Sequence, residues 1–228
     1  MKDMSLKELG QYFDHALLRA DVTIPELAAF CDEGVRLSVK MLAVNPAAVM
    51  FCKDRVAGSG VLVGAAVGFP LGQSTLETKI AETKDAIARG SDEIDYVINV
   101  GAFKSGHREY IVEEMQEIVA VCREKNVIAK VIFENCYLTD DEKKALCEIA
   151  NEVRPDYIKT STGFGTGGAT VADVKLMRAY ADPAIKVKAS GGIKTLEDVR
   201  QLIEAGALRI GTSNTAGIMD AFAKRGGF

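Results

Sequence analysis

The stretch Val61-Leu62-Val63-Gly64-Ala65-Ala66-Val67 contains no polar side chain and is rich in valine. A strand with one wet face alternates apolar and polar residues, whereas a strand covered on both faces reads as a continuous apolar run. Such runs are typical of parallel sheets, in which helices cover both faces. The stretch therefore predicts a buried strand of an α/β protein.

Outward from this run, short β-branched segments alternate with longer amphipathic ones along the whole chain. This alternation is typical of βαβ units and a parallel sheet. The expected strands number eight: Tyr12–Leu17, Leu37–Val44, Val61–Val67, Ile94–Val100, Val127–Phe133, Tyr157–Thr160, Ile185–Ala189 and Leu208–Gly211.

Helix signals fill the spaces between the strands. The expected helices include Glu77–Arg89, Glu109–Arg123 and Asp140–Val153, with a short one at Ser5–Gln11 before the first strand. Ser74 stands three residues before Glu77, which is the spacing of a capping box. Gly90 and Gly206 follow two of the helical segments as stops.

Eight strand and helix units predict a (β/α)₈ barrel, that is, a TIM barrel with a short N-terminal helix. An open doubly wound sheet is the structural alternative. No linker rich in Pro, Gly or Ser divides the 228 residues, so we expect one domain over residues 1–228.

The composition excludes several classes of protein. Hydrophobic residues make up 48% and charged residues 26%, which argues against a disordered chain. No apolar run is long enough to span a membrane, and the segment Met1–Ser5 lacks the apolar core of a signal peptide. The net charge of −4, without a basic block, argues against nucleic acid and anionic membrane as partners.

Cysteine and histidine are too few and too scattered for a disulfide framework or a zinc site. The five cysteines are Cys31, Cys52, Cys122, Cys136 and Cys147, and the two histidines are His15 and His107. No CxxC occurs, so reduced cytosolic thiols and packing roles are expected. We also expect no bound metal.

Charged residues interrupt five of the expected strands, namely Asp14, Asp95, Lys130, Lys159 and Lys188. A charge within a buried strand needs a partner, and a solvated strand end or a structural ion pair is the simplest explanation for any one of them. In a barrel, however, side chains at the carboxyl ends of the strands converge on one site. The set therefore indicates an active site.

Two lysines on adjacent strands favour imine chemistry. Neighbouring ammonium groups repel, which lowers the pKa of one of them, and a neutral amine attacks carbonyls to form a Schiff base. An aspartate and the second lysine can then move the protons. Lys159, Lys188 and Asp95 thus suffice to break a carbon–carbon bond beside a carbonyl without metal or cofactor.

Glycine-rich loops follow the last two strands, at Ala189–Ile193 and Arg209–Asn214. In barrels these loops commonly bind phosphate through backbone N–H groups, although tight turns alone would also use glycine. Thr160–Gly168 contains a G-x-G-x-x-G spacing, but the expected acidic residue is absent downstream, so a loop over the pocket is favoured over a dinucleotide site. His15, beside Asp14, is a further pocket candidate, whereas His107 is expected at an exposed helix start.

At these residues the chain resembles the deoxyribose-phosphate aldolase family, from about Leu9 to the last helix. The matching segments are Phe13–Leu18, Glu93–Asp95, Lys130–Glu134, Tyr157–Gly163, Val187–Ile193 and Arg209–Ser213. The resemblance implies that Lys159 forms the Schiff base, while Asp95 and Lys188 donate and accept protons. It also implies substrate or phosphate contacts for Asp14, Lys130, Thr162, Gly163, Gly191, Gly192, Gly211, Ser213 and Asn214.

The implied reaction is reversible cleavage of 2-deoxy-D-ribose 5-phosphate to D-glyceraldehyde 3-phosphate and acetaldehyde, by a cofactor-free class I aldolase. The resemblance further implies a cytoplasmic homo-oligomer, a dimer or a tetramer, that acts in deoxyribose phosphate catabolism and carbohydrate degradation. Its expected partners are the phosphorylated sugar and acetaldehyde.

The chain departs from the family at three positions: Ala43 in place of a frequent cysteine, Asn214 in place of a frequent serine, and Phe228 at an end where some members carry tyrosine. None of these removes the imine machinery. Two alternatives remain open at this point: a related lysine-dependent lyase or transferase acting on another phosphosugar, and a phosphosugar-binding barrel without catalysis.

Overall fold

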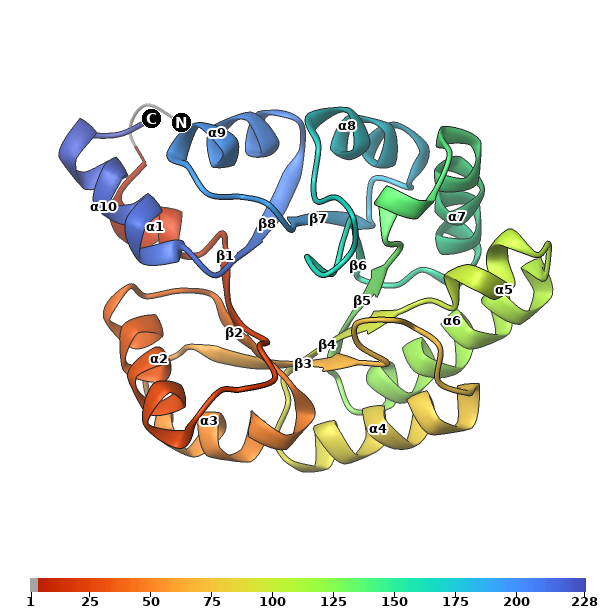
Figure 1. Cartoon of the computed structure of the whole chain (residues 1–228), viewed down its shortest axis with the longest axis horizontal. Coiled ribbons are helices and arrows are strands. Elements are labelled where there is room, and N and C mark those ends of the chain that lie inside the picture. Colours follow the sequence, from red (N-terminus) through yellow and green to blue (C-terminus); the bar gives the residue numbers. More distant parts are fainter. Residues whose placement is uncertain (1–3) are drawn as a thin grey trace.

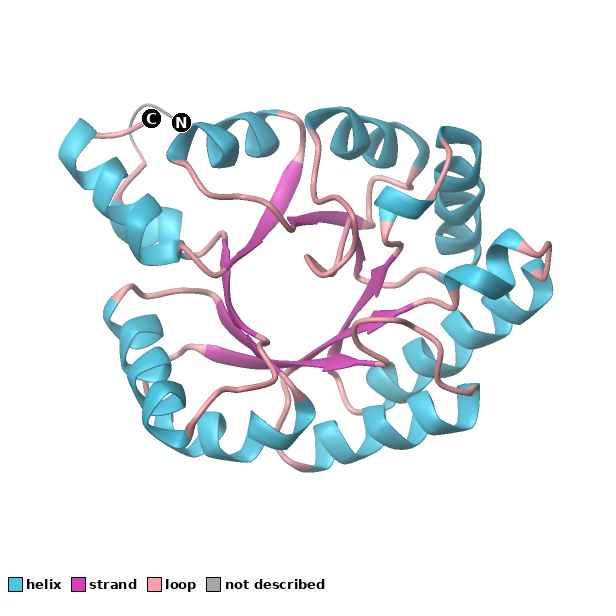
Figure 2. Cartoon of the chain, in the orientation of Figure 1, coloured by secondary structure: helices cyan, strands magenta, loops and turns pink. Residues whose placement is uncertain are grey.

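A closed barrel of eight parallel strands forms the centre of the computed structural model, which describes residues 4–228. Helices surround the ring of strands (Figures 1 and 2). The strands pair in sequence order, and the last pairs with the first. Their bounds are β1 Phe13–Leu17, β2 Met41–Val44, β3 Leu62–Val67, β4 Glu93–Val97, β5 Ile128–Ile132, β6 Tyr157–Lys159, β7 Lys186–Ser190 and β8 Ala207–Thr212.

The (β/α)₈ barrel predicted from the sequence is confirmed, and the open sheet is excluded. Met1–Asp3, in the segment expected to lack a signal-peptide core, lie outside the described residues. The helices are α1 Leu6–Gly10, α2 Ile24–Arg36, α3 Val49–Arg55, α4 Leu76–Ala88, α5 Val100–Lys104, α6 Arg108–Glu124, α7 Asp140–Val153, α8 Val171–Tyr180, α9 Leu196–Glu204 and α10 Thr215–Arg225, with 3₁₀ turns η1 Pro46–Ala48 and η2 Asn135–Tyr137.

Helix ends follow the expected signals with one correction. The cap of α4 is Thr75, whose hydroxyl accepts from the Thr78 N–H, and not Ser74. Thr75 has the extended backbone that a cap needs, so the first helical turn begins one residue later than the capping box predicted. Gly90 and Gly206 follow their helices with φ of +101° and +112°, as helix stops do.

Two strands depart most from their predicted bounds, because the caps of neighbouring helices lie within the expected ranges. β2 begins at Met41 because α2 continues to Arg36 and Leu37 caps its C-terminal end. β4 ends at Val97 because the Asn99 side chain accepts from the Ala102 N–H and starts α5. Hydrophobic periodicity alone does not locate these strand ends, because helix caps set them.

The main apolar core lies between the barrel and its helices. On β4, Ile94 and Tyr96 belong to this core, whereas Glu93 and Asp95 alternate with them and make ion pairs inside the barrel. The strands therefore direct charge inward. Among the described helices, none combines the length and apolar character needed to cross a bilayer.

Candidate active site

Seven ionisable side chains are buried inside the barrel, each at most 4% exposed. They come from six strands: Asp14 from β1, Glu93 and Asp95 from β4, Lys130 from β5, Lys159 from β6, Lys188 from β7 and Arg209 from β8. The strand register sets Asp95 beside Lys130, and Lys159 beside Lys188. Charges distant in sequence thus meet in one layer.

Asp95 is the centre of this cluster. One carboxylate oxygen accepts from Lys130 at 2.6 Å, and the other accepts from Lys159 at 2.7 Å and from Lys188 at 2.6 Å. The structure therefore brings together the three residues predicted to perform the chemistry. Lys159 is the last residue of β6, so its amine lies toward the carboxyl end of the barrel.

Arg209 completes the cluster from β8. Its Nε donates to Asp14 at 2.5 Å, and its two terminal nitrogens donate to Glu93 at 3.2 and 2.9 Å. Asp14 is also paired with Lys188, and Glu93 with Lys130. Six groups therefore close a ring of alternating charge, hereafter the charged ring: Arg209, Asp14, Lys188, Asp95, Lys130, Glu93 and back to Arg209.

The charged ring contains three anions and three cations, and Lys159 is bound to it as an additional cation. Burial lowers the pKa of Lys159 to about 8; the nearby charge of Lys188 acts in the same sense, and Asp95 opposes it. Although burial alone would raise it, the pKa of Asp95 is held well below its usual range by Lys130, Lys159 and Lys188. Lys159 is thus the group in the cluster that can lose a proton near neutral pH and become a nucleophile.

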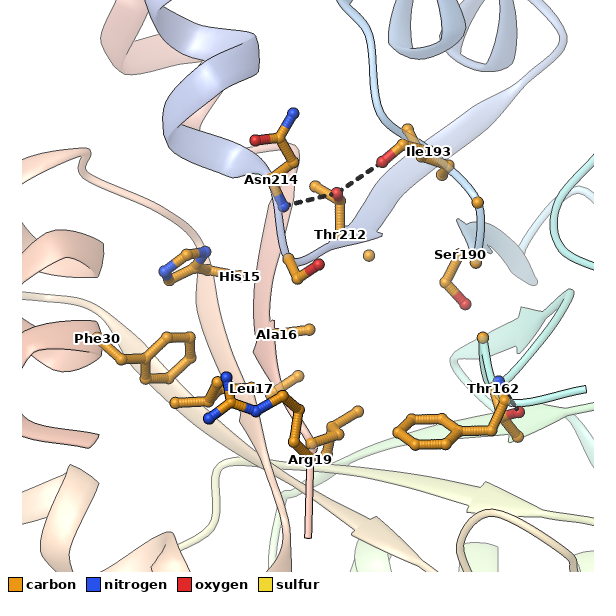
Figure 3. Close-up of a pocket in the computed structure, with 18 of the residues that line it drawn as sticks. His15, Ala16, Leu17, Arg19, Phe30, Thr162, Ser190, Ile193, Thr212 and Asn214 are labelled. Atoms are coloured by element: carbon orange, nitrogen blue, oxygen red, sulfur yellow. Dashed lines mark hydrogen bonds between the residues drawn. The ribbon is translucent and has the colours of Figure 1, made fainter. Parts of the chain in front are cut away.

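Lys159 and Lys188 contribute to the lining of a cavity of about 840 Å³. Figure 3 shows other residues that line this cavity. Of the other predicted residues, the cavity is lined by Thr162, Gly163, Gly191, Gly192, Gly211, Ser213 and Asn214. Asp14, Asp95 and Lys130 are not part of this lining. Asp14 and Lys130 lie inside the charged ring, where their charged groups already face partners.

The predicted anion loops line one wall of the cavity. Gly191 and Gly192 have φ of +87° and +74°, a conformation that glycine adopts without strain. Within the described chain, the N–H groups of Gly191, Gly192 and Ser213 donate to no acceptor. They are therefore available to an anion.

The loops after β7 and β8 are held together by Thr212. Its hydroxyl donates to the Ile193 carbonyl at 2.8 Å and accepts from the Asn214 N–H at 3.0 Å (Figure 3). The Asn214 side chain donates to the Lys194 carbonyl at 2.8 Å. Asn214 therefore links the two loops, and this bond uses one of its two amide hydrogens.

The loop after β6 extends over the barrel opening in Figure 1. Glu134, at a left-handed φ of +58°, accepts from the Thr162 N–H at 3.0 Å and also from the Thr162 hydroxyl. Phe164 packs edge-on against Phe69, with ring centroids 5.3 Å apart. These contacts hold the loop in place, and it forms one wall of the cavity.

The two histidines lie apart. His15 lines the cavity and stacks on Phe30, with ring centroids 4.4 Å apart (Figure 3). Its Nδ1 lies 3.0 Å from the Thr215 hydroxyl. Burial lowers the pKa of His15 to about 4, which favours a neutral imidazole. His107 is exposed at the start of α6, as expected.

The described part of the chain offers no group of three or more His, Cys, Asp or Glu side chains suited to hold a metal ion. The five cysteines are free thiols, and four of them are buried. The carboxylates that cluster in the barrel are instead paired with lysine and arginine.

Glu93, Glu134 and Arg209 were not singled out from the sequence. Glu93 precedes Asp95 by two residues and Arg209 precedes Gly211 by two, so strand alternation places each pair on one face. That signal could have found Glu93 and Arg209. Glu134 lies beyond the end of β5, and nothing in the local sequence indicates that it binds Thr162.

The chain is similar to known aldolases in sequence and in structure. Residues 10–219 match the model of the DeoC/LacD family of aldolases. The chain is 49% identical over 209 residues to the deoxyribose-phosphate aldolase of Lactobacillus acidophilus, covering 92% of this chain and 88% of the relative. It is 48% identical to that of Bacteroides thetaiotaomicron, covering 96% and 92%.

Solved structures show the same relationship. An aldolase named QR15 superposes with a TM-score of 0.89 at 39% identity, covering 94% of this chain and 95% of that one. The tetrameric deoxyribose phosphate aldolase of Aeropyrum pernix superposes with a TM-score of 0.90 at 28% identity, covering 97% and 93%.

The barrel and the family match define the class: an aldolase, and therefore a lyase. Within that class, the chain belongs to the deoxyribose-phosphate aldolases of the DeoC/LacD family, which are aldehyde-lyases. Its activity is aldol cleavage of deoxyribose phosphate.

Proposed function

We propose that the enzyme cleaves 2-deoxy-D-ribose 5-phosphate reversibly to D-glyceraldehyde 3-phosphate and acetaldehyde, through a Schiff base on Lys159. The observation that carries this proposal is the environment of the Lys159 amine. It lies on the cavity wall, 2.7 Å from Asp95, and burial lowers its pKa to about 8. A substantial fraction of the amine is therefore neutral at physiological pH.

The cleavage begins when neutral Lys159 attacks C1 of the open-chain sugar and water leaves, which gives a protonated imine. A base removes the proton of the C3 hydroxyl, and the C2–C3 bond breaks. Its electron pair moves toward the imine to form an enamine, and C3 leaves as the aldehyde of glyceraldehyde 3-phosphate. Protonation of the enamine at C2 gives the imine of acetaldehyde. Its hydrolysis consumes one water, which balances the water lost at the start, and releases acetaldehyde and free Lys159.

Asp95 and Lys188 are the proton carriers in this scheme. Both lie within hydrogen-bond distance of one another, and Asp95 also contacts Lys159 directly. Lys188 lines the cavity, so it can pass a proton to or from C2 through a water molecule. No step requires a metal or an organic cofactor.

The phosphate is bound by the loops after β7 and β8. The free N–H groups of Gly191, Gly192 and Ser213 support this assignment, with Gly211 shaping the floor and Asn214 joining the loops. Thr162 and Gly163 bound the opposite wall. Asp14 and Lys130 act from beneath the cavity, through Lys188 and Asp95, rather than on the substrate.

A substrate comparison tests the proposal. The enzyme should release acetaldehyde from 2-deoxyribose 5-phosphate and leave ketose phosphates intact, and Lys159→Leu should abolish the release. Cleavage of a ketose phosphate at a similar rate would favour a related lysine-dependent lyase. Binding of the phosphosugar without any turnover would favour a non-catalytic barrel.

We further propose that residues 1–228 form one barrel domain and that the enzyme works as a homo-oligomer, a dimer or a tetramer. The tetrameric relative from Aeropyrum pernix supports assembly. Five free thiols support the cytoplasm as the compartment. The partners are the phosphosugar and acetaldehyde, with neither nucleic acid nor membrane involved.

A further inference from the structure

The charged ring contains two residues to which the reaction scheme gives no task. Arg209 and Glu93 face each other through a two-pronged bond at 3.2 and 2.9 Å, and neither lines the cavity. Both are almost completely buried. Burying an ion pair removes both ions from water at a cost in free energy, so a packed apolar pair could have served stability alone.

Arg209 and Glu93 each reach a catalytic group through one intermediate. Arg209 holds Asp14, which pairs with Lys188, and Glu93 pairs with Lys130, which donates to Asp95 at 2.6 Å. Arg209 therefore restrains the position of Lys188, and Glu93 restrains that of Asp95. Because Arg209 and Glu93 are also bound to each other, the pair holds both proton carriers in place.

The ring also fixes the net charge that Lys159 faces. Three carboxylates balance three cations, so protonated Lys159 leaves one uncompensated positive charge in a buried site. Loss of its proton makes the cluster neutral. Buried net charge is unfavourable, so this balance favours the free amine.

We infer that Arg209 and Glu93 are positioning residues of the aldolase, which hold Lys188 and Asp95 in place and set the charge that keeps Lys159 a free amine. This inference rests on the proposed imine chemistry. Its distinctive consequence is that the two residues act on Lys159 in opposite directions, although they form one ion pair.

Lys159 and Arg209 each face charged or titratable groups on the neighbouring strands. Lys159 faces Asp95 from β4, Lys130 from β5 and Lys188 from β7. Arg209 faces Asp14 from β1 and Glu93 from β4. On β6 it faces Tyr157, whose ring centroid lies 5.8 Å from the guanidinium carbon, and Lys186 of β7 reaches the same ring at 5.4 Å.

The test measures how fast acetaldehyde and borohydride label Lys159 at each pH, in the full-length enzyme and its variants. Arg209→Gln leaves the ring with a net negative charge, so the midpoint of labelling should rise by about one pH unit. Glu93→Gln leaves it positive, so the midpoint should fall by a similar amount. The double variant restores neutrality and should return toward the wild-type midpoint.

Two further variants separate charge from packing. Arg209→Lys keeps the positive charge but loses the guanidinium that donates two hydrogen bonds to Glu93. The midpoint of labelling should therefore stay near that of the wild type, while turnover falls. Asp173→Asn is the matched control, because Asp173 pairs with Lys143 at 2.6 Å in the helix layer, outside the ring. It should leave the midpoint unchanged.

Equal shifts in one direction for Arg209→Gln and Glu93→Gln, or no shift in either, would overturn the inference and leave a purely structural pair. If Arg209→Gln does not fold, Glu93→Gln and the double variant still decide, since their midpoints must differ from each other. Failure of the wild type to be labelled at Lys159 would instead refute the proposed function itself.

Discussion

A single amine, that of Lys159, carries the proposed chemistry, and its environment dictates how the reaction depends on pH. Its pKa is lowered to about 8 by burial, with Lys188 acting in the same sense and Asp95 opposing. The neutral fraction of an amine increases as the pH rises through its pKa. Formation of the imine should therefore accelerate from pH 6, reach half of its maximal rate near pH 8 and level off above about pH 9.

Lys188 is the residue whose replacement separates the two roles of the cluster. Lys188→Leu removes a proton carrier, which should reduce turnover by about 10²-fold. It also removes a positive charge near Lys159, so the pKa of Lys159 should rise and labelling by acetaldehyde should need a higher pH. Steady-state kinetics and the labelling rate against pH measure the two effects.

Lys186→Leu is the matched control for Lys188→Leu. Lys186 lies two residues earlier on β7 but is exposed, and it contacts the ring of Tyr157 rather than Asp95. It should keep the wild-type pH profile. Full activity of Lys188→Leu at neutral pH would show that another group moves the proton.

At the scale of elements, the site depends on three loops packed against each other. The loops after β6 and β7 approach so closely that a Cβ on Gly168 would lie 2.2 Å from the Gly191 carbonyl oxygen. Thr212 then joins the loop after β7 to the loop after β8. These contacts shape the backbone on which the proposed phosphate site is built.

Gly192→Leu should weaken the phosphate site selectively. A Cβ at Gly192 meets no atom within 4 Å, so the new side chain is free to enter the space where the anion binds. Loss of charge-assisted hydrogen bonds should raise KM for the phosphorylated substrate by roughly tenfold or more, and that for unphosphorylated deoxyribose much less. Parallel kinetics with both sugars measure the difference.

Gly58→Leu is the control for backbone strain. Gly58 has a similar φ of +77° and equally open surroundings, but it lies in the loop between α3 and β3 at the other end of the barrel. It should destabilise the fold without changing the preference for phosphate. An equal loss for both sugars in Gly192→Leu would argue against phosphate binding at this loop.

At the scale of the whole molecule, the sequence predicted the barrel because each strand carries its own apolar signal. It also predicted that Asp95, Lys159 and Lys188 belong together, since charges in buried strands require partners. The sequence did not predict how deep each of the charged side chains lies within the barrel. The substrate contacts expected of Asp14 and Lys130 contrast with their observed place beneath the cavity, because closure of the barrel, and not strand position, decides which inward side chain reaches the opening.

Other features depend on contacts that no local pattern contains. Arg209 meets Asp14 across 195 residues and Glu93 across 116, so the charged ring exists only once all eight strands have closed. The bond from Thr162 to Glu134 likewise joins two loops that follow different strands. The order in which neighbouring strands pair, by contrast, follows from the βαβ order.

The most direct measurement is mass-spectrometric mapping of the enzyme after incubation with acetaldehyde and reduction with borohydride. We expect one added ethyl group on Lys159, formed by reduction of the imine. We expect none at this site in Lys159→Leu, and we expect Lys188→Leu to be labelled at Lys159 at high pH. Labelling of Lys188 in place of Lys159 in the wild type, or cleavage of deoxyribose 5-phosphate by Lys159→Leu, would contradict the central role of Lys159.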